Sequence, residues 1–275
     1  MIAARRLPRL LVSAALLLLA LVFFFPLIWM VMSSFKTNSA IFSAPFSPPD
    51  SIDFSKWAEA WTVGNLGQYA INSAIVTIAS VVLILLLGAA AAYALSRYRF
   101  RGRGLVLGLF ALGLILPLQS YFIAQSSIFT RLGITDTRLA LIIPYTAMGL
   151  SLAVYLLKVY LDALPDELYE AARIDGASDR QMFASVALPL LRPGLATVAI
   201  FSALAAWNEF LLALLYIQDD ALKTIPTGLL AFSTRYVTDY SLLFSALSIV
   251  TIPMIVIYVV FNRQIVAGIT AGSVK

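Results

Sequence analysis

The sequence predicts an all-α membrane protein that forms one domain over residues 1–275 and crosses the bilayer six times. Of its 275 residues, 61% are hydrophobic and 12% are charged, and the mean hydropathy is +0.92. The apolar residues form long runs, which indicate membrane-spanning helices when they reach about 20 residues. Because backbone groups in lipid must be paired within the segment, such continuous runs predict helices rather than barrel strands.

Six apolar runs are long enough to cross about 30 Å of hydrocarbon at about 1.5 Å per residue. They cover residues 10–35, 70–96, 104–130, 139–157, 193–218 and 240–262. The first run follows Arg5, Arg6 and Arg9 and is too long for the apolar core of a signal peptide, so we expect it to remain as the first span. One proline lies in each of the third, fourth and sixth runs and should kink its helix: Pro117, Pro144 and Pro253.

The distribution of Lys and Arg predicts that both termini lie in the cytoplasm. With six spans, 13 of the 19 Lys and Arg residues fall on the side of the termini and 6 on the other side. Basic residues collect on the cytoplasmic face of membrane proteins, and RYRFRGR at 97–103 is the strongest local cluster. The net charge of +5 is therefore explained by topology, without a nucleic-acid partner.

The residue inventory excludes several kinds of chemistry. There is no Cys and no His, which removes thiolate catalysis, Cys-based metal sites and the usual proton shuttle. We therefore predict no catalytic residue and no metal site. The sequence also lacks the G-x-x-x-x-G-K-[ST] phosphate-binding loop, so the chain is expected to hold no ATP or other cofactor itself.

A polar loop at 158–192 separates the fourth and fifth runs and predicts two short helices around a turn. Three acidic residues after Pro165 suit the start of a helix, and Gly176 suits a left-handed position at its end. Ser178 or Asp179 is expected to cap the second helix. On pattern alone, two interpretations stay open: an amphipathic loop that covers the helix bundle, or a docking element.

The sequence EAA-x3-G-x9-V-x-LP within this loop closely resembles the EAA motif of ATP-binding cassette importer permeases, EAA-x3-G-x9-I-x-LP. Only Val186 departs, in place of the usual Ile. In that family the loop is a coupling helix that sits in a cleft of the ATPase subunit. The resemblance thus implies that a set of residues in the motif contacts the ATPase: Glu170, Ala171, Ala172, Asp175 and Gly176.

The resemblance extends over nearly the whole chain, through residues 72–103, 132–145 and 206–215 and the C-terminal GITAGSVK. These segments resemble the carbohydrate branch, in particular the maltose-permease-type second subunit. The implied partners are a second permease subunit, two ATPase subunits that bind ATP and Mg, an extracytoplasmic sugar-binding protein, the sugar and membrane lipid. The implied location is a bacterial or archaeal plasma membrane, and ATP hydrolysis belongs to the partners.

Polar residues within the spans are candidates for the translocation path. Glu209 is the only charged residue in the six runs and follows Trp207 and Asn208. Such a residue normally faces a cavity or the bundle interior, so a path-lining role and a helix-packing role are equally open. Gln119 and Gln125 add polar groups to the outer half of the third run.

Two other classes of function compete with an importer subunit. A self-contained secondary transporter or channel needs an intramembrane ion or proton relay, but Glu209 stands alone and no inverted repeat is visible. A membrane enzyme needs a catalytic cluster, and the sequence offers none.

Overall fold

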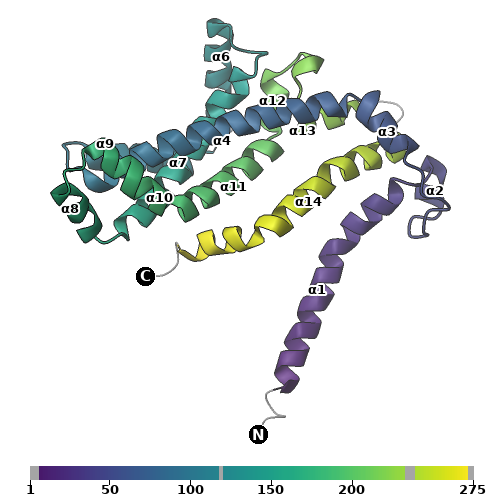
Figure 1. Ribbon diagram of the computed structural model, residues 1–275. Coiled ribbons are helices and arrows are strands. Elements are labelled where there is room, and N and C mark those ends of the chain that lie inside the picture. Colours follow the sequence, from purple (N-terminus) through teal and green to yellow (C-terminus); the bar gives the residue numbers. More distant parts are fainter. Residues whose placement is uncertain (1–5, 118–119, 233–238, 272–275) are drawn as a thin grey trace. The chain divides into compact units, whose positions relative to one another are not determined.

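The computed structural model describes residues 6–117, 120–232 and 239–271 (Figure 1). Within these ranges the regular elements are all helices and there is no strand, which confirms the all-α prediction. The chain divides into two packed units. The first contains residues 1–67 and 228–255, and the second contains residues 68–227 and 256–275.

The first unit joins the N-terminal helices to the beginning of the last helix. Its elements are α1 (Arg6–Ser33), α2 (Asn38–Ser43), α3 (Ser55–Thr62), η5 (Leu229–Phe232) and the first half of α14 (Tyr240–Ala271). The backbone N–H of Ser241 donates to Asn38 Oδ1 over 3.0 Å, and Lys56 Nζ lies 3.3 Å from Asp239 Oδ2. These polar bonds fix α2 and α3 to the start of α14.

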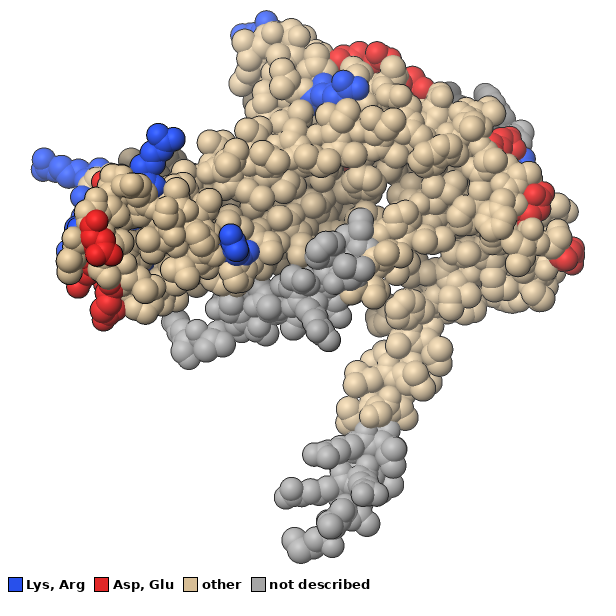
Figure 2. Space-filling model, in the orientation of Figure 1, with Lys and Arg blue, Asp and Glu red and all other residues tan. Residues whose placement is uncertain are grey.

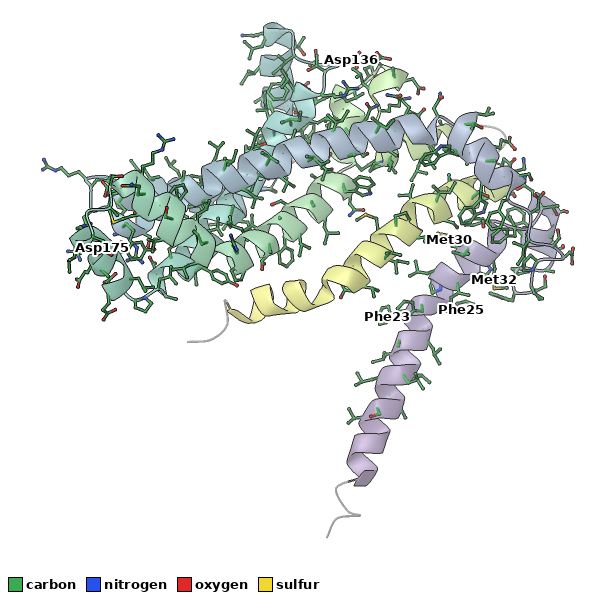
Figure 3. The ribbon with its side chains drawn as sticks, in the orientation of Figure 1. Phe23, Phe25, Met30, Met32, Asp136 and Asp175 are labelled. Atoms are coloured by element: carbon green, nitrogen blue, oxygen red, sulfur yellow. The ribbon has the colours of Figure 1, made fainter. Side chains whose placement is uncertain are left out.

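Helix α1 presents apolar side chains that stay largely exposed within its unit. Phe23 is 74% exposed and Phe25 is 52% exposed, and Figure 3 shows both projecting from the helix. The apolar window within 12–33 contains no buried residue. This is the surface expected of a helix whose surroundings are lipid.

The second unit is a bundle of apolar helices in which small residues permit close approach. Its main elements are α4 (Leu66–Arg97), α5 (Arg103–Ile115), α6 (Phe122–Leu132), α7 (Leu139–Asp162), α11 (Arg192–Asn208) and α12 (Leu211–Tyr216). A Cβ atom at Gly113 would lie 2.2 Å from Ser151 Oγ, and one at Gly88 would lie 2.9 Å from Ala153 Cβ. Helices α5 and α4 therefore pack on α7 at distances that glycine makes possible.

Two of the predicted spans are interrupted. In the third, α5 ends at Ile115 and α6 begins at Phe122, with Pro117 in the break. Proline lacks the N–H that would continue the ladder, and its ring clashes with the preceding turn. Pro144 lies only in the second turn of α7 and leaves that helix continuous.

The fifth predicted span also differs from the continuous helix that its apolar run predicts. Helix α11 ends at Asn208, Glu209 is extended with φ −68° and ψ 124°, and α12 begins at Leu211. No proline causes this break, and the partners of Glu209 described below account for it.

Among the described residues, three helical segments are long and apolar enough to cross a bilayer singly: residues 12–33, α4 and α7. Helix α5 and residues 240–256 of α14 are shorter apolar helices. The segment 179–190 and α11 form a pair that is bent by 72°. Several apolar helices are thus present, arranged with breaks that hydropathy alone does not reveal.

Candidate functional site

The 158–192 loop folds into two helical segments around a glycine turn. Helix α8 (Glu167–Ile174) leads into Gly176, which has φ +80°, the left-handed conformation expected there. Ser178 caps the second segment in a reciprocal box, since Gln181 Oε1 accepts from the Ser178 N–H at 2.8 Å. That segment runs through α9 (Asp179–Gln181), the π-helical turn η3 (Met182–Ala187) and α10 (Leu188–Leu190).

The loop has a buried side and an exposed side. Tyr169 is 6% exposed, and Met182 and Ala187 are also buried in the hydrophobic core below α8. Of the residues that the motif marks for contact, Ala172 is half-buried and the others are exposed: Glu170, Ala171, Asp175 and Gly176. Figure 3 shows Asp175 at the outer end of this loop, and Figure 2 shows acidic side chains gathered on the same end. The loop can therefore meet another chain without unfolding.

Arg97, the last residue of α4, anchors the loop from below. Its Nη1 donates to Asp166 Oδ1 at 2.5 Å and its Nη2 donates to the Leu161 carbonyl oxygen at 2.8 Å. Its Cζ lies 3.6 Å from the ring centroid of Tyr169, in cation–π contact. One guanidinium thus touches the start of α8, the end of α7 and the buried face of α8. Ser96 adds a bond to Asp162 at 2.6 Å.

A pocket of about 220 Å³ opens beside this anchor. It is lined by Tyr93, Arg97, Tyr98, Asp166, Tyr169, Glu170, Arg173, Asp179 and Met182. The lining combines acidic, basic and aromatic side chains. Partial burial, with a hydrogen bond to Asp179, raises the pKa of Tyr98, so its hydroxyl stays protonated at neutral pH. The pocket offers donors and acceptors to an incoming polar side chain.

Glu209 occupies the break between α11 and α12 and pairs the backbone N–H groups that the break leaves free. Its carboxylate accepts from the Leu212 N–H at 2.9 and 3.1 Å and from the Ala213 N–H at 3.2 Å. The Tyr145 hydroxyl donates to Glu209 Oε2 at 2.7 Å. The first N–H groups of a helix have no partner within the helix and carry partial positive charge. The carboxylate therefore pairs the first N–H groups of α12, and the partial positive charge of these groups stabilises the carboxylate.

The other polar candidates do not converge on one point. Asn208 donates to the Leu204 carbonyl oxygen at 2.8 Å and is exposed, whereas the Trp207 Nε1 is buried and unpaired within the described part of the chain. Gln125 accepts from the Tyr216 hydroxyl at 3.0 Å. Gln119 lies outside the described residues. Trp207, Asn208 and Gln125, the candidates that the structure describes here, do not form a single ligand site among themselves.

A second polar network holds the segment that follows α12. Asn72 of α4 donates to the carbonyl oxygens of Ala221 and Lys223 at 2.8 and 3.0 Å and accepts from Arg138 at 2.9 Å. Asp136, labelled in Figure 3, accepts from the N–H groups of residues 218 and 219 at 2.9 Å each. Asn72 is fully buried, so its bonds form in apolar surroundings and fix this segment to α4.

Sequence reasoning did not identify Arg97, Tyr145 or Asn72 as members of these networks. Arg97 is visible in the sequence only as one of four basic residues in RYRFRGR, and its partners lie 64 to 72 positions further along the chain. A single apolar run carries no signal for such long-range pairs. The one local signal is an unpaired charge, which for Glu209 did indicate a polar partner nearby.

The sequence matches known transport proteins along most of its length. Residues 84–270 match the family model of the binding-protein-dependent transport system inner membrane component. The diacetylchitobiose uptake system permease protein NgcG of Streptomyces coelicolor is 39% identical over 96% of this chain and 88% of its own. The trehalose/maltose transport system permease protein MalG of Thermococcus litoralis is 32% identical over 98% of each chain.

The fold has a counterpart among solved structures. A chain of a bacterial ATP-binding cassette transporter that imports the acidic polysaccharide alginate superposes with a TM-score of 0.82, covering 94% of this chain and 97% of that one. The two are 23% identical, so this likeness establishes the shared fold. Together with the family match and the relatives, it shows that this chain belongs to the family of binding-protein-dependent transport system inner membrane components.

Proposed function

We propose that this chain is a permease subunit of an ATP-driven importer of short saccharides. Its family transports solutes that a binding protein delivers, and two relatives with coverage above 85% are named for diacetylchitobiose and for trehalose and maltose. Both relatives are named for disaccharides. A disaccharide or a short oligosaccharide is therefore the substrate class that we assign to the complex.

The observation that carries the mechanism is the build of the 158–192 loop. Four of its five motif residues are exposed, on α8 and on the turn that follows it, while Tyr169 and Arg97 fix the inner face of α8 to the spans. A rigid element with this arrangement moves as a body when a partner pushes it, and it takes α7 and α11 with it. We therefore assign the loop as the coupling element, with Glu170 and Gly176 at its contact with the ATPase.

The chain needs partners for energy and for substrate delivery. It has no phosphate-binding loop, so ATP and Mg belong to two ATPase subunits, and this chain is not itself the enzyme. A second permease subunit completes the path, and an extracytoplasmic binding protein delivers the sugar. A second solved structure with a similar fold is that of a bacterial alginate transporter in complex with a periplasmic protein that holds an alginate pentasaccharide, which is consistent with such an assembly.

For topology we propose six crossings with both termini in the cytoplasm. The three long apolar helices supply three crossings. We assign the other three to α5 with α6, to α11 with α12, and to α14. The excess of Lys and Arg on the side of the 158–192 loop supports this orientation.

For the path we propose that the break at Glu209 lies beside the route of the sugar. Asn208 is exposed at that break, and the Trp207 indole has an N–H that is unpaired within the described residues. Because Glu209 is already bound to α12 and Tyr145, its role is to shape the break and not to carry a proton. This weakens the alternative of a self-contained secondary transporter, which needs a titrating relay.

The test is purification of the transporter through an affinity tag on this chain, followed by reconstitution into vesicles. We expect ATPase subunits and a second permease to co-purify, and ATP to drive uptake of a labelled disaccharide when the binding protein is present. Uptake that follows an ion gradient without ATP, or a chain that purifies without any ATPase, would refute the proposal.

A further inference from the structure

We propose that Arg97 is the positioning residue through which the 158–192 loop moves α4, and that α4 carries this motion to the segment after α12. The inference rests on the proposed function of the loop. The loop is joined covalently to α7 and α11 but not to α4. Its motion can therefore reach α4 only through contacts between side chains and backbone.

The first step is the contact at the lower end of α4. The Arg97 side chain is 16% exposed. Its planar guanidinium donates to Asp166 and to the Leu161 carbonyl oxygen and also contacts the Tyr169 ring. A lysine cannot make all three contacts, since its ammonium is a compact charge on a flexible chain. A displacement of α8 is therefore passed to the end of α4 through one rigid group.

The second step is the stiffness of α4. It is one helix of 32 residues without proline or interruption. By contrast, the third and fifth predicted spans are broken, and α1, α7 and α14 each contain a proline. At about 1.5 Å per residue, the 25 positions from Asn72 to Arg97 span about 38 Å. Figure 1 shows α4 running from α8 at one end to α12 and α13 (Ile225–Gly228) at the other.

The third step is the contact at the far end of α4. Asn72 and Ser73 are both buried, and they hold residues 221–225 by three bonds to the backbone. These are the two Asn72 bonds to carbonyl oxygens and a 2.9 Å bond from the Ile225 N–H to Ser73 Oγ. Residues 221–225 thus follow α4 when it shifts. The helix connects the loop at one side of the unit with a segment at the other side.

The experiment uses the purified, reconstituted transporter and the fact that the chain has no native cysteine. Two single-cysteine reporters are made. Ile174→Cys, at a position 86% exposed on α8, reports docking of the ATPase, and Ala221→Cys reports movement of the far segment. Each is combined with Arg97→Ala, with Arg97→Lys or with Arg99→Ala, which removes an exposed neighbour outside the contact.

With Arg97→Ala we expect the ATPase still to protect Ile174→Cys and to turn over. Sugar imported per ATP should fall about tenfold, within the usual range of coupling between sites. The nucleotide-dependent change in labelling of Ala221→Cys should disappear. Arg97→Lys should give intermediate values, and Arg99→Ala should match the parent.

An unchanged import ratio together with an unchanged Ala221→Cys response in Arg97→Ala overturns the inference. If Arg97→Ala does not assemble, Arg97→Lys decides: assembly with a reduced response supports the inference, and a full response overturns it. If Ile174→Cys is unprotected even with Arg97 in place, the proposed coupling role of the loop fails first. The two failures are therefore distinct.

Discussion

Replacing Gly176 by valine separates backbone strain from docking. Gly176 has φ +80°, and a Cβ added there meets no atom within 4 Å. The only cost inside the chain is thus the left-handed conformation, about 1–2 kcal/mol for an L-residue and more for a β-branched one. This is too little to prevent insertion of the spans, so we expect a folded chain whose loop no longer fits the ATPase.

Gly133 provides a matched control. It also ends a helix with positive φ, at +68°, and also has open space around its Cβ position. Both turns carry the same bond pattern: the residue after each glycine donates to the carbonyl five positions earlier, Ala177 to Ala172 and Ile134 to Phe129. Valine at either position should therefore cost a similar amount of stability.

The assay measures sugar uptake, ATPase activity and thermal unfolding of the reconstituted complex. We expect Gly176→Val to lose uptake and Gly133→Val to retain it, with similar unfolding temperatures. Glu170→Ala alone should have a small effect, since one exposed pair contributes about 0–1 kcal/mol. Full uptake in a Gly176→Val and Glu170→Ala double variant, or an equal loss in Gly133→Val, would refute the assigned role of the loop.

Three further predictions concern the polar networks. Glu209→Ala should destabilise the purified chain by about 3 kcal/mol, because it leaves the α12 N–H groups and the Tyr145 hydroxyl unpaired. Glu209→Gln keeps an acceptor and should cost about 1 kcal/mol. Thermal unfolding in detergent measures both effects. Asn72→Ala should cost about 2 kcal/mol and increase protease cleavage after α12, and an unchanged cleavage pattern would contradict this. Burial raises the pKa of Asp239, but bonds from the Leu242 N–H and Lys56 outweigh it, so the pKa lies below 3.8. Its stabilising contribution is therefore complete above about pH 3.8 and lost below, which pH-dependent protease protection of parent and Asp239→Asn proteins will show.

The sequence was most informative where a single run decides the structure. The ends of α4 at Leu66 and Arg97 lie close to the predicted 70–96, and α7 begins at the predicted residue 139. Polar residues stop these helices, and the runs between them are long enough to span a bilayer. The turn at Gly176 could also be predicted from the sequence, because glycine after a short amphipathic helix commonly ends that helix in the left-handed conformation.

The sequence was least informative where a distant side chain decides the structure. Hydropathy does not distinguish one helix over 193–218 from two helices with a break, because both arrangements place the same apolar residues in lipid. The break depends on Tyr145, 64 positions before Glu209. The Arg97 contact likewise depends on Asp166, 69 positions away. Pairs at such separation become visible only when the helices are placed.

The break at Glu209 and the charge at Glu209 are best understood as one feature. An interrupted helix in apolar surroundings leaves backbone N–H groups unpaired, and each such group is costly without an acceptor. An isolated carboxylate in the same place is also costly. Placed together, as the 2.9 Å bond to Leu212 shows, each removes the penalty of the other. The charge is thus explained without ion transport, and the break offers a place where α11 and α12 can change their angle while α4 stays continuous.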